Sequence, residues 1–121
     1  MSEPDIVKTL FDKLLLAPIQ RFPRDGEKLD APKQPGIYVL YGPRNKVIYV
    51  GLAAGANGLR SRLMTHLVQS AFHESKYGSA LRSRGGFRCL IVENRRQRKL
   101  LEAYATGCLC PTYLGGIEWL P

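Results

Sequence analysis

Two short apolar segments with a turn between them constrain the fold of this chain more than any other feature. Residues 36–41 and 46–51 are rich in isoleucine, valine and tyrosine, which favour β-strands. The intervening residues 42–45 read Gly-Pro-Arg-Asn, a composition typical of a tight turn. The pattern therefore predicts a β-hairpin.

The register of this hairpin follows from the length of its loop. With a four-residue loop, residue i of the first strand pairs with residue 87 − i of the second, which places Tyr38 opposite Tyr49. Directly paired residues project from the same face of a sheet, so the two tyrosines share a face. The other face is then predicted to carry Ile37, Val39, Ile48 and Val50.

A helix is predicted before the hairpin. Ser2 can cap a helix whose first turn contains Pro4, and apolar residues then recur at helical spacing until about Pro18. Residues 20–35 mix Pro, Gly, Asp and Lys with little periodicity, which indicates a connecting arm. The apolar face of the helix either covers its own sheet or docks a partner protein; it contains Ile6, Leu10, Phe11 and Leu14.

More helices are predicted after the hairpin. Asn57 can cap a helix to about residue 70, residues 79–84 fit a short helix, and Asn94 can cap a helix to about residue 110. A strand is expected at residues 87–93. The predicted fold class is α/β (α+β), with a small mixed three-stranded sheet flanked by helices and an extra N-terminal helix. We expect residues 1–35 to form that helix and arm, and residues 36–121 to form the main domain.

Positive charge is concentrated in the middle of the chain. The formal net charge is +8, and residues 82–99 alone contribute +6. Arginine dominates this block, and its planar guanidinium binds phosphate oxygens in pairs. The charge therefore fits a nucleic-acid partner, and it fits a solvated basic surface equally well. The candidate nucleic-acid-binding residues are Arg60, Arg82, Arg84, Arg88, Arg95, Arg96, Arg98 and Lys99.

Other features bear on the cellular compartment. No stretch approaches the ~20 apolar residues that span a bilayer, so we expect no membrane partner. The three cysteines lack the even, regular spacing of a disulfide framework, which indicates reduced thiols and a cytoplasmic protein. Cys108 and Cys110 also lack the two-residue spacer usual in zinc sites.

Two tripeptides in the hairpin resemble the signature of a known family. Gly36-Ile37-Tyr38 and Tyr49-Val50-Gly51 lie ten residues apart, and a helical Leu59-x-x-Arg62-Leu63-x-x-His66 pattern follows. Glu102 then precedes a proline by nine residues and a tyrosine by eleven. In this order and spacing, residues 36–113 resemble the GIY-YIG nuclease superfamily.

The resemblance implies a nuclease that hydrolyses nucleic-acid phosphodiester bonds, with DNA as the expected substrate, and uses one divalent metal ion, Mg²⁺ or Mn²⁺. By position, Glu102 would hold the metal and Tyr38 would be the general base or orient the nucleophile, with Tyr49 beside it. Arg62 would clamp the phosphate and His66 would assist acid/base chemistry. These residue types suit the reaction, because preplaced positive charge stabilises the transition state and favours a phenolate.

Two departures from the family pattern leave alternatives open. The connection at residues 52–58 is about three residues longer than is common in the family, so Arg60 competes with Arg62 for the clamping role. Leu114 stands where the family generally has asparagine, and leucine cannot make the hydrogen bonds of an amide. The alternative function is therefore a catalytically impaired nucleic-acid-binding module of the same fold.

Overall fold

The computed structural model describes residues 1–24, 27–68 and 85–114. The predicted short helix at 79–84, together with Arg82 and Arg84, lies outside these residues. The elements are α1 (Glu3–Leu16), β1 (Gln20–Arg21), β2 (Gly36–Tyr41), the 3-10 turn η1 (Pro43–Asn45), β3 (Val47–Ala53), α2 (Gly58–Val68), β4 (Gly86–Ile91) and α5 (Arg95–Leu109).

The strands form one four-stranded sheet in the order β1-β4-β2-β3, and each pairing is antiparallel. The predicted class of helices packed on a small sheet is confirmed, but the predicted count of three strands and the mixed strand directions are wrong. The fourth strand is the residue pair Gln20 and Arg21, which lies in the segment expected to be a plain connection. Two residues are too few to show an alternation of apolar and polar side chains, so the sequence carried no signal for this strand.

The hairpin exists as predicted, but its register differs by two residues. Tyr38 pairs with Gly51, and Leu40 pairs with Tyr49. Because side chains alternate with a period of two, a shift of two residues leaves the two tyrosines on the same face. Tyr38 and Tyr49 therefore do share a face, as neighbours offset along the strands rather than as a direct pair.

A loop that is one residue longer than predicted and a β-bulge next to it each contribute one residue to the change of register. Tyr41 pairs with Val47 while Leu40 pairs with Tyr49, which leaves Ile48 as an extra residue in β3. Ile48 consequently packs in the same core cluster as Tyr38, so the prediction that it shares a face with Val50 is wrong. Loop length alone could not reveal this extra residue.

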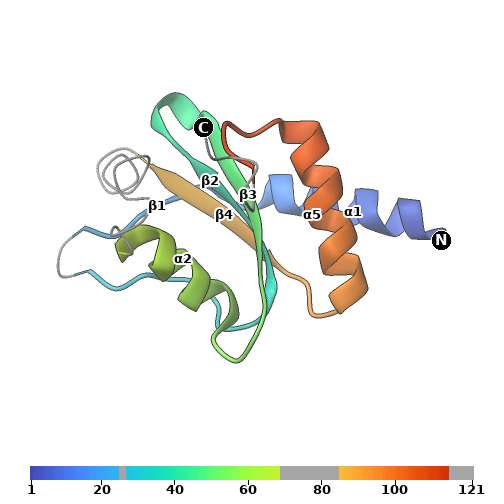
Figure 1. Cartoon of the computed structure of the whole chain (residues 1–121), viewed down its shortest axis with the longest axis horizontal. Coiled ribbons are helices and arrows are strands. Elements are labelled where there is room, and N and C mark those ends of the chain that lie inside the picture. Colours follow the sequence, from blue (N-terminus) through green and yellow to red (C-terminus); the bar gives the residue numbers. More distant parts are fainter. Residues whose placement is uncertain (25–26, 69–84, 115–121) are drawn as a thin grey trace.

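Helices cover both faces of the sheet (Figure 1). One core cluster lies between the sheet and α2, and it includes Tyr38, Leu59 and Leu63. The other lies between the sheet and the pair α1 and α5, and it includes Leu14 and Leu101. Three layers result, with β2 buried along its whole length between them.

The first helix is part of this structure rather than an appendage. Ser2 and Asp5 form a capping box at its start. Phe11 packs edge-on against Tyr104 of α5, with ring centroids 5.2 Å apart, and Leu14 is fully buried. The apolar face of α1 is therefore covered by its own chain, as in the first of the two readings above. None of the helices within the described ranges is long and apolar enough to cross a bilayer.

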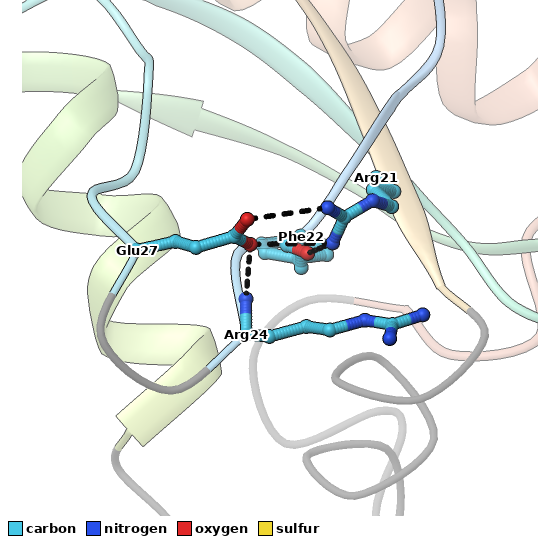
Figure 2. Close-up of polar contacts among 4 residues, drawn as sticks. All are labelled: Arg21, Phe22, Arg24 and Glu27. Carbon is cyan, nitrogen blue, oxygen red and sulfur yellow. Dashed lines mark hydrogen bonds and ion pairs between the residues drawn. The ribbon is translucent and has the colours of Figure 1, made fainter.

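The arm after α1 is held in place by a small polar cluster (Figure 2). The Arg21 guanidinium lies 3.4 Å from both carboxylate oxygens of Glu27 and donates to the Phe22 carbonyl. The Arg24 backbone N–H donates to Glu27 at 2.8 Å, and this bond, followed by Arg21, lowers the pKa of the Glu27 carboxyl. Phe22 is meanwhile buried against Phe87, so the arm has a defined path back to the hairpin.

Candidate active site

Two neighbouring strands place the signature tyrosines side by side. Tyr38, on β2, is fully buried, and Tyr49, on the edge strand β3, is partly buried. Their ring centroids are 6.1 Å apart. The Tyr38 phenol lies over Gly51, where an added Cβ would come within 2.5 Å of Cζ of Tyr38 and 2.8 Å of a ring carbon of Tyr49. The glycine of the second tripeptide therefore makes room for the Tyr38 ring, as glycine in a strand often does for a close approach.

Helix α2 adds two polar side chains that lie one turn apart. His66 Nε2 lies 2.7 Å from the Tyr38 hydroxyl oxygen, in hydrogen-bonding contact. The imidazole ring also lies 5.4 Å from the Tyr38 ring and 5.3 Å from the Tyr49 ring. The polar stripe that the sequence predicted for Arg62 and His66 is thus turned toward the tyrosines, because Leu59 and Leu63 bury the adjacent stripe against the sheet.

The electrostatics place Arg62 beside both phenols. Burial lowers the pKa of the Arg62 guanidinium, but charge and hydrogen-bonding interactions with Tyr38, and then with Tyr49, raise it above its ordinary value. Burial raises the pKa of the Tyr49 phenol above its ordinary value, and Arg62 opposes that shift. A guanidinium in this position favours the ionised form of a neighbouring phenol and is available to an incoming phosphate.

The residue that competed for this role, Arg60, points elsewhere. Its Nε donates to the Ala31 carbonyl at 2.8 Å, and its backbone N–H donates to the Pro32 carbonyl at 2.9 Å. The Leu59 N–H likewise donates to the Gln34 carbonyl at 3.0 Å. The first turn of α2 is therefore anchored to the arm that leads into β2, and Arg62 rather than Arg60 faces the tyrosines.

Glu102 reaches the same site from the other layer. It lies on α5, is half-buried, and its pKa is raised above the ordinary value by burial, against the opposing effect of Lys99. Its charge acts on Tyr49, whose pKa it raises further. Since Tyr49 is on the edge strand β3, a carboxylate on α5 can approach it around that edge. Side chains from β2, β3, α2 and α5 thus converge on one place.

Among the described residues of the site, the carboxylate that could bind a metal ion is that of Glu102. Within the described ranges, no group of three or more His, Cys, Asp or Glu side chains is arranged to hold a metal ion. The three cysteines are unpaired, and burial followed by the charge of Asp30 raises the pKa of Cys89 to about 11. A hard cation such as Mg²⁺ keeps several waters and needs few protein ligands, so Glu102 suits Mg²⁺ better than zinc.

The described arginines of the basic block do not all face solvent. Arg98 is buried, 7% exposed, and donates to the carbonyls of Val92 and Glu93 at 2.9 and 3.2 Å. Arg96 forms two hydrogen bonds with the Glu3 carboxylate of α1, at 2.7 and 2.9 Å. Both residues hold elements together, so we withdraw Arg98 from the proposed nucleic-acid surface and regard Arg96 as a link between α1 and α5.

Arg88 also has a structural position. It donates to the Leu15 carbonyl at the end of α1, and its guanidinium lies 5.4 Å from the centre of the Tyr41 ring. Its Nε is buried with no hydrogen-bond partner among the described residues. Arg95 and Lys99 instead line an open groove of about 640 Å³, and they are the described members of the block best placed for a ligand.

The segment after α5 runs back along the edge of the hairpin, which the sequence did not predict. Thr112 and Tyr113 donate backbone hydrogen bonds to the carbonyls of Val47 and Ile48, at 3.2 and 2.9 Å. Tyr113 packs against the cluster that contains the signature tyrosines. Leu114 follows and is 41% exposed, so nothing in the core requires an apolar side chain there.

Comparisons with known proteins identify relatives of this arrangement. No protein-family model matches the chain. UvrABC system protein C from Koribacter versatilis is 35% identical over 71 residues, which are 59% of this chain and 11% of that protein. The same protein from Pseudothermotoga lettingae is 36% identical over 74 residues, 60% of this chain and 13% of that protein. The chain therefore spans little more than a tenth of the length of these relatives.

Solved structures share the fold of this chain. The GIY-YIG N-terminal endonuclease domain of UvrC from Thermotoga maritima, bound to magnesium as its catalytic divalent cation, aligns with a TM-score of 0.51. The alignment covers 86% of this chain and 93% of that domain, at 23% identity. The resemblance inferred from the two tripeptides is confirmed, and the fold is that of a GIY-YIG domain.

Proposed function

We propose that this GIY-YIG domain is a metal-dependent endonuclease that hydrolyses phosphodiester bonds in DNA. The assignment as a nuclease rests on the similarity to the UvrC endonuclease domain. The observation that carries the rest is the 2.7 Å contact between the Tyr38 hydroxyl and His66 Nε2, with Arg62 beside the phenol. In this proposal residues 36–121 carry out the chemistry, and residues 1–35 support them through the contacts of α1 and the arm.

Each side chain has a role that its surroundings suit. The Tyr38 phenol gives its proton to His66, which lies within hydrogen-bonding distance. The resulting phenolate orients an attacking water and accepts the proton that the water loses. Arg62 binds non-bridging phosphate oxygens and stabilises the charge that develops on them. Tyr49 packs beside Tyr38 and keeps Arg62 in place through the interactions that raise the arginine pKa.

Glu102 is the residue that would hold the divalent metal ion, Mg²⁺ or Mn²⁺. A bound cation would supply Lewis-acid stabilisation of the phosphate and the leaving oxygen. The half-buried carboxylate, whose pKa is raised by burial, lies where a cation would relieve that unfavourable burial. One carboxylate suffices for this task when water and substrate oxygens complete the coordination shell.

One observation favours a second function. Leu114 lies directly after the segment that pairs with β3 and occupies the position where the family resemblance expects asparagine. Without that amide, the domain could bind DNA and cleave it poorly, as an impaired nucleic-acid-binding module. Because Leu114 is 41% exposed, Leu114→Asn should fold normally, and a rise in cleavage would show that the missing amide limits the activity.

The test is cleavage of a supercoiled plasmid and of a branched oligonucleotide duplex, in Mg²⁺, Mn²⁺ or EDTA. Tyr38→Phe should reduce the cleavage rate by about 10²- to 10⁴-fold. Glu102→Gln should abolish metal-dependent cleavage. Tyr104→Phe is the matched control, because Tyr104 is 39% exposed and packs on α1, away from the site. Retained DNA binding without metal-dependent cleavage would instead establish the binding module.

A further inference from the structure

A groove of about 640 Å³ lies between the end of β3 and the first turns of α5. The apolar residues Leu52, Ala54 and Leu100 form its floor, and four basic residues also line it, Arg95, Arg96, Arg98 and Lys99. This volume is within the range of about 300–1,000 Å³ that is usual for ligand-binding sites. An apolar floor with a cationic margin suits a ligand that has both a flat apolar part and a negative charge.

Two of these four cations are available to such a ligand. Of the four basic residues at positions 95–99, Arg98 is turned inward onto carbonyls and Arg96 is bound to Glu3. Neither Arg95 nor Lys99 forms a salt bridge or side-chain hydrogen bond with any of the described residues. Arg96 and Arg98 therefore hold the fold together, whereas the side chains of Arg95 and Lys99 are available to a ligand.

The groove lies on the α5 side of the sheet and shares that helix with Glu102, whereas the signature tyrosines pack on the α2 side. Lys99 is one helical turn from Glu102, and its charge acts on that carboxylate. Arg95 lies seven residues before Glu102, which is about 10 Å along the axis of an α-helix. In a DNA strand successive phosphates advance about 3.4 Å along the helix axis, so the groove begins within a few nucleotides of a phosphate held at Glu102.

We propose that this groove binds unpaired nucleotides of the strand that is cut, next to the scissile phosphate. The bases of a duplex are stacked inside it and would leave the apolar floor uncovered, whereas an unpaired base can lie on that floor while its phosphates meet Arg95 and Lys99. The domain therefore prefers DNA with an unpaired segment beside the cleavage position. The inference rests on the proposed function for the identity of the strand, but its test requires only binding.

The test compares two alanines that lie two residues apart. Ala54→Glu places a carboxylate in the groove, and Ala56→Glu makes the same change on an exposed loop residue that does not line it. Binding is measured in EDTA by fluorescence anisotropy, with a DNA hairpin that has a five-nucleotide unpaired arm and with the same hairpin made blunt. Thermal unfolding of both variants checks that they are folded.

We expect Ala54→Glu to weaken binding of the armed hairpin at least about fivefold and to leave blunt-hairpin binding as in Ala56→Glu. Replacing both Arg95 and Lys99 with glutamine should reduce the slope of log K against log salt by about 1.4 for the armed hairpin. Equal effects of the two glutamate variants on the armed hairpin, or equal binding of both hairpins by the wild type, would overturn the proposal.

The outcome is independent of cleavage. If the wild type prefers the armed hairpin through this groove but cuts neither DNA in Mg²⁺ or Mn²⁺, the nuclease assignment fails while the groove assignment holds. If it cuts both hairpins equally and Ala54→Glu changes nothing, the nuclease assignment holds while the groove assignment fails.

Discussion

Gly51→Ala is expected to disable the site by adding one methyl group. The new Cβ would lie 2.5 Å from Cζ of Tyr38 and 2.8 Å from a ring carbon of Tyr49. Carbon atoms in contact prefer separations of about 3.5–4.0 Å, so the Tyr38 ring has to move by about 1 Å. A displacement of this size at a reacting group costs about 10²-fold in rate, and overpacking of a core typically costs about 1–3 kcal/mol of stability.

Gly107→Ala is the matched control for this change. Gly107 lies within α5, and no atom lies within 4 Å of the position that its Cβ would take. Alanine is favoured over glycine in a helix by about 0.5–1 kcal/mol. This variant should therefore be slightly more stable than the wild type and equally active.

Single-turnover cleavage in Mg²⁺ and urea unfolding at 25 °C provide the two measurements. The expected pattern is a cleavage rate reduced about 10²-fold for Gly51→Ala, with KM and far-UV circular dichroism close to wild type. The hydrogen bond between Tyr38 and His66 should also be lost, which the NMR shift of the imidazole would report. If Gly51→Ala cleaves like Gly107→Ala, the placement of the phenol over the glycine does not control catalysis, and the reasoning is refuted.

Three further outcomes follow from the same contacts. Burial raises the pKa of Glu102, so the ionised form is disfavoured in the folded state and stability is lost as pH rises through that raised pKa. Glu102→Gln should therefore raise Tm at neutral pH but not at a pH below the ordinary pKa of a glutamate. Mg²⁺ should raise the Tm of the wild type and leave that of the variant unchanged. A lower Tm of the variant at pH 7 would contradict this reasoning. Arg60→Met should reduce kcat about tenfold, because the Arg60 side chain donates to the Ala31 carbonyl and its loss would misplace α2. The slope of log K against log salt for DNA binding should stay unchanged. A slope reduced by about 1 would identify Arg60 as a phosphate contact instead. Arg98→Met should cost about 2–3 kcal/mol in urea unfolding through lost hydrogen bonds to two carbonyls, whereas Arg95→Met should stay within about 0.5 kcal/mol of the wild type.

Local signals were sufficient for the described helices, for the three longer strands and for the fold. The capping residues Ser2 and Asn94 start α1 and α5 where the sequence indicated, because a cap satisfies backbone groups within its own first turn. Alternation in the hairpin correctly placed Tyr38 and Tyr49 on one face, because the register differs from the predicted one by an even number of residues. The ordered tripeptides and the helical Arg62–His66 pattern identified a fold that the structural comparison then confirmed.

Long-range contacts decided what the sequence left open. The bulge at Ile48, the pairing of β1 with β4 and the choice of Arg62 over Arg60 each depend on which distant segment supplies a hydrogen-bond partner. The roles of the arginines are the clearest case: their identical side chains carry the same charge, but Arg98 is buried on carbonyls while Arg95 faces a groove. The sequence by itself determined where the described helices and the three longer strands form, because caps and alternation act within a few residues. Only the tertiary structure decided which charges are used to hold the fold and which remain for a ligand, because that depends on the carbonyls and carboxylates that folding brings beside each of them.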